Sequence, residues 1–314
     1  MTLAALTDQK TSRMAHLRAV KAYVALFVGV VSIAWSAIFV RWTQMPGITS
    51  AFYRVLLAAV ALWPFLLFSR RERPRIASST LCWAALGGIC FAGDLGLYNT
   101  AVLSTSAGSA TFLGNNSPLL VGLLSWAITR RFPSTRFWAA LGVALAGAWC
   151  IVSVDAHHTG ARSTADLLAV GASACFALYL IVTERVRESC DTLTLFVLST
   201  TASSIALLAV AIGTHSSLTI PSITSLAALL GLGLICQLTG YVCLTYALGH
   251  LPATVTSLIM LAVAPLTAVF ALLIFGETMS LLQAIGGGLV LLGVWMVTRA
   301  YCKPKPLRAR TSAP

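Results

Sequence analysis

Ten apolar stretches follow one another along the chain and take up roughly two thirds of its 314 residues. A helix needs about 20 apolar residues to cross the roughly 30 Å of hydrocarbon in a bilayer, so each stretch is long enough for one crossing. The segments between the stretches are too short for a soluble domain. The sequence therefore predicts an all-α integral membrane protein with ten transmembrane helices, at Ala22–Trp42, Thr49–Phe68, Thr80–Asn99, Ser104–Thr129, Thr135–Val154, Ala165–Thr183, Thr192–Gly213, Ser222–Leu244, Pro252–Phe275 and Ser280–Arg299.

The composition excludes an ordinary soluble fold. Charged residues make up 10% of the chain and the mean hydropathy is +0.88, whereas soluble domains carry about 25% charged residues. The first apolar stretch is long and is followed by no clear cleavage site, so we expect it to be a retained helix. The eight cysteines show no metal-ligand spacing, and we expect neither a metal nor a cofactor.

The basic residues set the expected orientation. If the N-terminus is cytoplasmic and the chain crosses ten times, the cytoplasmic segments hold four, four, three, two and five Lys or Arg residues, which is 18 of 21. An excess of this kind marks cytoplasmic loops. We therefore predict a multi-pass protein of the bacterial inner membrane, with both termini in the cytoplasm. Short basic loops spread over one membrane face do not form a nucleic-acid footprint, so no nucleic-acid partner is expected.

An internal repeat divides the chain in two. The Ser-Pro-Leu sequence at 117–119 has a counterpart in the Ala-Pro-Leu sequence at 264–266, which is 147 residues later. After a slip of one residue, Gly142, Gly147 and Trp149 match Gly288, Gly293 and Trp295. Both matched stretches contain a proline-bearing helix, a short loop and a glycine-bearing helix.

Five helices per copy is an odd number, so the second copy must enter the membrane upside down. The predicted organisation is a cytoplasmic tail at 1–21, a first five-helix repeat at 22–154, an outer connecting loop at 155–164, a second five-helix repeat at 165–300 and a basic cytoplasmic tail at 301–314. Two inverted repeats are typical of secondary transporters, whose substrate site lies near the membrane midplane where the repeats meet. A duplication without an alternating-access role is the alternative.

Several short motifs then carry a resemblance to a known family. They are Ala34-Trp35-Ser36-Ala37-Ile38-Phe39, Ala51-Phe52-Tyr53-Arg54, the stretch from Ser106 through Ala110 to Pro118, then Pro265, Phe275-Gly276-Glu277, and Gln283 with Gly286 and Gly293. In their order and spacing, over about residues 22–300, they resemble an EamA-type transporter of the drug/metabolite transporter superfamily. The resemblance implies a proton-coupled or facilitative carrier of amino acids, other metabolites or toxic compounds, frequently in the export direction. The family often has glutamate in the first-half loop at the position equivalent to Glu277, where this chain has Arg130.

Two charged residues within the apolar stretches are the first candidates for a substrate site. Arg54 lies in the second stretch and Asp94 in the third, and a charge at the centre of a membrane helix costs about 2.5–3.5 kcal/mol on insertion scales. At 1.5 Å per residue both are expected about 7 Å outward of the midplane. They pair with each other, or one of them meets a charged substrate, or a neutral Asp94 carries a coupling proton. Alternatively, Arg54 snorkels to the outer interface.

Polar and aromatic residues add further candidates. Asn115 and Asn116 precede Pro118, whose ring frees a backbone carbonyl that can bind a polar ligand; interhelical hydrogen bonding is the alternative. Pro265 is expected to kink the second copy in the same way, beside apolar neighbours. A cavity wall is expected from four aromatic residues and one amide, although aromatic residues near helix ends are often interfacial: Trp35, Tyr98, Tyr179, Tyr241 and Gln237.

We expect a secondary transporter of small organic solutes, working by alternating access as a monomer or homodimer in a lipid bilayer. No ATP-binding or hydrolase motif is present in the sequence. The alternatives are an intramembrane enzyme acting on lipid-linked substrates, which would need clustered catalytic groups at one membrane depth, and a passive channel.

Overall fold

A computed structural model describes residues 3–68, 77–104, 110, 113–114, 116–130, 132–155, 162–276 and 280–301, and the described secondary structure is helical. The first half contains α1 (Leu3–Ala34), α2 (Ser36–Thr43), α3 (Gly47–Phe68), α4 (Ser78–Ser104), α6 (Ser117–Thr129) and α7 (Thr135–Asp155). The second half contains α8 (Arg162–Val186), α9 (Thr192–Gly213), α10 (Ile223–Leu230), the π-helix η1 (Gly231–Tyr241), α11 (Val242–Leu248), α12 (Ala253–Met260), α13 (Val263–Phe275) and α14 (Leu281–Tyr301).

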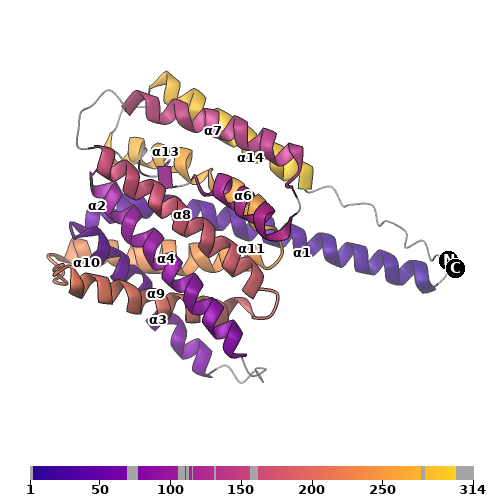
Figure 1. The fold of residues 1–314 in the computed structure, drawn as a ribbon, viewed down its shortest axis with the longest axis horizontal. Helices are drawn as coiled ribbons and strands as arrows, with labels where there is room; N and C mark the ends of the chain where they lie inside the picture. The colour runs from indigo at the N-terminus through magenta and orange to yellow at the C-terminus, as the bar shows by residue number, and fades with distance from the viewer. Residues whose placement is uncertain are drawn as a thin grey trace.

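Within the described residues, eight helical spans are long and apolar enough to cross a membrane. Three of them combine consecutive helices: α1 with α2, α10 through η1 with α11, and α12 with α13. The shorter apolar α6, with 13 residues, and the 21-residue α7 lie within the remaining two predicted crossings. The predicted all-α fold with ten membrane helices is therefore confirmed. The beginning of α1 and the end of α14 lie on the same side of the bundle (Figure 1).

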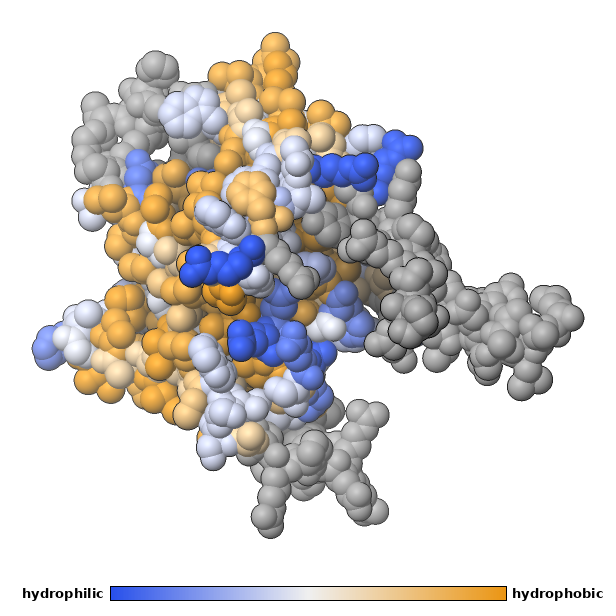
Figure 2. Space-filling model, turned by 45° about the vertical axis from the view of Figure 1, so that its right-hand side comes forward, coloured by the Kyte–Doolittle hydropathy of each residue, from blue (hydrophilic) through white to orange (hydrophobic). Residues whose placement is uncertain are grey.

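The outer surface of the bundle is apolar. Large hydrophobic side chains such as Phe27, Ile205, Leu273 and Leu281 are exposed, and orange, hydrophobic residues cover much of the face in Figure 2. A soluble protein rarely exposes such surface. In a bilayer these side chains contact lipid, and the polar groups are left for the interior.

Proline breaks the corresponding span in each half. Pro118 is the second residue of α6, and Pro265 is the third residue of α13. A proline cannot donate to the carbonyl four residues earlier, and around Leu261 and Ala262 the chain makes tighter bonds three residues apart before α13 begins. Helix α13 starts near the middle of the span from Ala253 to Phe275, and α6 starts near the middle of the stretch predicted at 104–129.

The two short helices that follow these breaks are equivalent. Each has 13 residues, and their first residues are 263 − 117 = 146 positions apart. Each ends at a residue with left-handed backbone, Arg130 at φ 54° and Gly276 at φ 65°, whose N–H bonds the carbonyl four residues earlier. The structure thus aligns Arg130 with Gly276 and not with Glu277, at the spacing of 146 residues that also relates Gly147 to Gly293.

Helices α7 and α14 pack on each other at the edge of the bundle (Figure 1). A methyl group added at Gly147 would collide with the carbonyl of Gly286, and one added at Gly293 would come within 2.6 Å of the carbonyl oxygen of Ala140. Positions 140 and 147 lie 146 residues before positions 286 and 293, so the two close approaches are related by the repeat. Small residues allow membrane helices to approach this closely.

Helix α4 is longer than predicted. It begins at Ser78 and ends at Ser104, whereas the sequence predicted a helix over 80–99 and a new one from Ser104. The polar residues at its end do not stop it, because Thr100 donates to the Gly96 carbonyl and Asn99 donates to Ser50. As a consequence, Asp94 lies only three residues beyond the helix middle, or about 5 Å at 1.5 Å per residue. The sequence had predicted it about 7 Å from the middle of a shorter helix.

The π-helix η1 is a second feature that the sequence did not predict. Its 11 residues interrupt the span from Ile223 to Leu248, and the Thr239 hydroxyl donates to the carbonyl of Leu234, five residues earlier. π-helices are rare, and those that occur are often found at functional sites. Both Gln237 and Tyr241 belong to η1.

Candidate functional site

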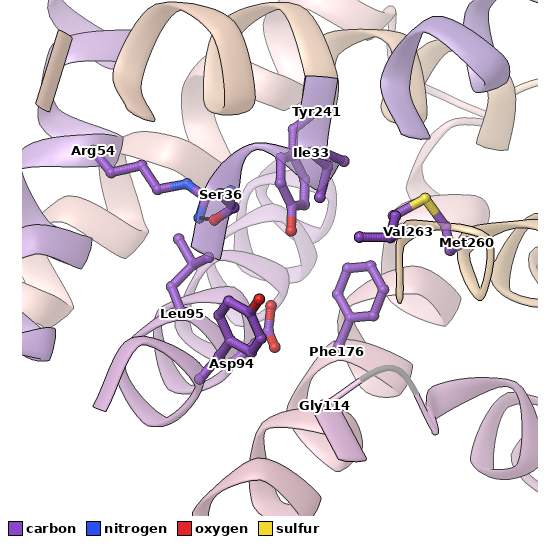
Figure 3. A pocket seen from close by; sticks show the side chains of 11 residues that line it. Ile33, Ser36, Arg54, Asp94, Leu95, Gly114, Phe176, Tyr241, Met260 and Val263 are labelled. Carbon is purple, nitrogen blue, oxygen red and sulfur yellow. Dashed lines mark hydrogen bonds between the residues drawn. The ribbon is translucent and has the colours of Figure 1, made fainter. Parts of the chain in front are cut away.

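A small cavity lies in the interior between the two halves (Figure 3). The first half contributes Ile33, Ser36, Arg54, Asp94, Tyr98 and Gly114 to its wall, and the second half contributes Phe176, Tyr241, Met260 and Val263. Gly114 and Val263 flank the proline breaks of the two spans. The cavity volume is about 30 Å³, and a buried water needs about 10–15 Å³ on this measure. The cavity therefore has room for about two water molecules.

Arg54 is the most polar group of the wall and is 1% exposed. Its Nε donates to Gln237 Oε1 at 3.0 Å, and its Nη1 donates to the Ser36 hydroxyl at 2.7 Å. The guanidinium also lies over the Tyr241 ring, 5.3 Å from the ring centre. Its Nη2 has no hydrogen-bond partner. Arg54 thus does not extend to the membrane interface, and these contacts fix its head group in the protein interior.

Asp94 projects from α4 into the same cavity and is 7% exposed. Arg54 is near enough for its charge to act on the carboxylate. Figure 3 shows Arg54 with Ser36 on one side and Asp94 below them. An isolated buried carboxylate is costly unless it is paired or neutral, so Asp94 is a candidate both for an interaction with Arg54 and for binding a proton.

An aromatic cluster lies beside the charged residues. Tyr241 packs on Phe91, with ring centres 4.7 Å apart, and Phe91 stacks on Tyr179 at 4.6 Å. Tyr179 and Phe91 are both 1% exposed, while Phe176 reaches the cavity wall. The cluster joins α4, α8 and η1 into one wall. Tyr179 is not one of the lining residues, and its ring centre lies 6.5 Å from that of Tyr241, which lines the cavity.

The remaining candidate residues lie at different distances from the cavity. Tyr98 lines it, and Gln237 meets it through Arg54. Trp35 lies at the junction of α1 and α2 and stacks on Phe270, with 4.6 Å between the ring centres, and is not one of the lining residues. Asn116 is half-buried and precedes α6, without a side-chain bond to that helix. Asn115 lies outside the described residues.

The sequence missed several wall residues. Ser36 accepts a hydrogen bond from Arg54. It belongs to the same motif as Trp35 but was not predicted as a site residue. Phe176, Met260 and Val263 are apolar and have no feature that separates them from other lipid-facing or core residues. Only the helix orientation in three dimensions brings them to the cavity.

A larger hollow lies between α3 and α9 on the outside of the bundle. Its volume is about 310 Å³, and its walls include Phe52, Leu56, Trp63 and Ile205. Its polar groups are few, and the Trp63 indole N–H already donates to Thr201 at 3.1 Å. Ligand sites combine apolar walls with convergent polar groups, so we place the candidate site at the central cavity. No group of three or more metal-ligating residues occurs in the part of the chain that the structure describes.

Two repeats with broken spans around a buried polar cavity define a membrane transporter fold. The EamA-like transporter family matches residues 20–153 and, separately, residues 163–299, so the chain belongs to this family. The predicted repeats, at 22–154 and 165–300, differ from the matched segments by one or two residues at each end. The resemblance that the motifs suggested is confirmed.

The relatives found by sequence are also named as transporters. An uncharacterized transporter of Bacillus subtilis (strain 168), YwfM, is 28% identical over 71% of this chain and 75% of its own length. An uncharacterized transporter of Archaeoglobus fulgidus is 27% identical over 88% of this chain and 97% of its own length. One crystal structure superposes with a TM-score of 0.69 over 89% of this chain and 97% of that chain, at 17% identity, which shows the fold alone.

Proposed function

We propose that the protein is a secondary transporter of small organic solutes that works by alternating access through the central cavity. The observation that carries this proposal is the meeting of Arg54 and Asp94, both buried, at a cavity between the broken spans of two inverted repeats. Intramembrane charges of this kind mark substrate or ion pathways. An intramembrane enzyme would need several catalytic groups here, and Asp94 is the one carboxylate among the lining residues.

The size of the cavity supports alternating access over a passive channel. About 30 Å³ holds water but no metabolite. A solute can therefore enter only when the helices around the cavity move apart. Such movement is typical of two inverted repeats that rock against each other around a fixed midplane site.

The membrane, the direction and the coupling are parts of the same proposal. The 18 basic residues in the loops of one face support a bacterial inner membrane protein with cytoplasmic termini. We favour export, with Asp94 as the group that binds a coupling proton, and either a monomer or a homodimer as the working unit. A fluorescent protein fused to the C-terminus should fluoresce in cells, because that end is expected to be cytoplasmic.

Counterflow in liposomes tests the transport function. Purified protein is reconstituted in liposomes preloaded with one unlabelled solute from a panel of amino acids, carboxylates, amines and nucleobases, and uptake of the same labelled solute is followed. We expect uptake above that of protein-free liposomes, with saturation at high solute concentration. Flux that rises linearly with concentration would indicate a channel, and no flux for any solute would contradict the proposal.

A further inference from the structure

We infer that the cavity binds a carboxylate group of the substrate between Arg54 and Gln237. The inference rests on the proposed transport function and names the substrate class for that site. It starts from two buried hydrogen-bond donors that lack a partner, Arg54 Nη2 and Gln237 Nε2. Both residues are essentially inaccessible, at 1% and 0% exposure.

The hydrogen bonds within the cluster leave these donors open by geometry. The Gln237 oxygen already accepts from Arg54 Nε, so the amide nitrogen of the same side chain is the end that remains. The Ser36 hydroxyl accepts the hydrogen bond from Arg54 Nη1. An unpaired buried donor costs about 1–3 kcal/mol, and more if it is charged, and native proteins rarely keep one without a reason.

A carboxylate has the acceptors that these two donors lack. Arg54 lines the cavity, and Gln237 is bonded to Arg54. A carboxylate carries two acceptor oxygens and forms paired, charge-assisted hydrogen bonds with guanidinium groups. A neutral amide or amine cannot supply the same charge, and an ammonium group would be repelled by Arg54. About two waters fit the cavity, and they can occupy the donors until a substrate replaces them.

The protein holds Arg54 ready for such a ligand. The Tyr241 ring lies under the guanidinium, and Ser36 and Gln237 fix two of its nitrogens. Arg54 is therefore already ordered before the ligand binds. The entropy cost of fixing its side chain does not have to be met by the binding energy, which favours affinity.

Asp94 limits the form of the substrate. A bound carboxylate would face the Asp94 carboxylate across a cavity of about 30 Å³. The charges balance if the substrate also carries an ammonium group near Asp94, or if Asp94 binds a proton. The substrate carries a carboxylate in both cases. The Asp94→Asn variant distinguishes them, because it removes the partner of an ammonium group in the first case only.

Thermal stabilisation by matched ligands tests the inference. The purified protein is heated with 3-phenylpropionate, 3-phenylpropionamide, phenethylamine or phenylalanine, and with the smaller set propionate, propionamide, ethylamine and alanine. A ligand that binds the folded state raises its melting temperature. We expect stabilisation by members that carry a carboxylate, and none by the amides or amines of the same size.

Variants locate the binding to the two donors. Gln237→Glu places a carboxylate of the chain itself beside Arg54, so the variant should stay folded and lose carboxylate binding by at least tenfold. Gln283→Glu makes the same chemical change at α14, where Gln283 accepts from the Ser280 N–H, and should bind as before. Asp94→Asn should retain simple carboxylates and weaken the zwitterions only if an ammonium group sits at Asp94.

Two results would overturn the inference. The first is equal stabilisation by the amides or amines, and the second is no stabilisation by any carboxylate in either set. Saturable counterflow of an amine or a neutral solute in liposomes would then leave the transport function standing without the carboxylate site. Absence of counterflow for every solute would instead remove the transport function itself.

Discussion

The packing of α7 on α14 and the central cavity are both built between the two repeats, but the repeats contribute differently to them. At the helix packing, Gly147 and Gly293 play matching roles against residues 286 and 140. At the cavity, the first half supplies Arg54 and Asp94, whereas the second supplies apolar and aromatic side chains. Gln237 of the second half bonds to Arg54 but does not belong to the lining residues. The comparison teaches that duplication preserved the packing while the chemistry of the copies diverged.

The largest expected effect comes from breaking the equivalent packing. Gly147→Leu and Gly293→Leu each force a side chain into a backbone carbonyl, and overpacking of this kind costs about 3 kcal/mol. The two variants should lose similar free energy of unfolding, measured by denaturant titration in detergent. Gly142→Leu and Gly288→Leu are the controls, since no atom lies within 4 Å of an added Cβ there. Equal losses in all four variants would contradict the paired contact.

Removing the charge of Arg54 should strongly reduce transport, with less effect on folding. Arg54→Gln loses the charged donors that face the cavity, and charge-assisted hydrogen bonds contribute about 1.5–3 kcal/mol each. We expect saturable counterflow to fall roughly 10- to 100-fold, since 1.4 kcal/mol is a factor of ten. Arg299→Gln is the control, because Arg299 is exposed over Trp295 at the end of α14. Unchanged flux in Arg54→Gln would place the substrate elsewhere.

Asp94→Asn should separate exchange from coupling. If the carboxylate binds the coupling proton, the variant should keep solute counterflow at equal pH but lose the additional flux that a pH gradient drives. Asp166→Asn makes the same change in α8, at a residue that does not line the cavity. A pH-driven flux that survives in Asp94→Asn would show that another group binds the proton, or that transport is facilitative.

The smallest effect is expected on the outside of α7 and α14. Trp149 and Trp295 are equivalent in the repeat and are 69% and 54% exposed. Either residue changed to alanine should shift the free energy of unfolding by about 0.5 kcal/mol or less, as for other exposed positions. A clear loss in both variants, together with a smaller particle in light scattering, would reveal a homodimer that covers this face.

Much of the fold could be predicted from the sequence because long apolar stretches identify membrane spans and matching motifs identify repeats. The apolar stretches gave the number of crossings, and Pro118 and Pro265 marked the equivalent breaks. The end of α4 could not be predicted, because the polar residues Asn99, Thr100 and Ser104 are typical of a loop. In the structure, they donate hydrogen bonds within α4 and to α3. The π-helix also has no sequence signal of its own, since it depends on the packing around it.

The candidate site could be predicted in part for a related reason. Arg54 and Asp94 stand out because charges are rare in apolar helices, and their burial in one cavity agrees with that reasoning. The partner Ser36 and the wall residues Phe176 and Val263 depend on helix rotation, which a sequence without an alignment does not define. Trp35 shows the opposite limit: it lies near the midplane, but its side chain packs against Phe39 and Phe270.

Because α7 and α14 meet through equivalent residues, one five-helix unit inserted in both orientations could form the same contact with a second copy of itself. An ancestor of that kind, a homodimer of half-length chains, would have placed two arginines and two aspartates around one cavity. In a single chain that contains both units, each copy can mutate independently. A homodimer carries every residue of its cavity in two copies. A single chain with two halves can instead carry one Arg54 and one Asp94.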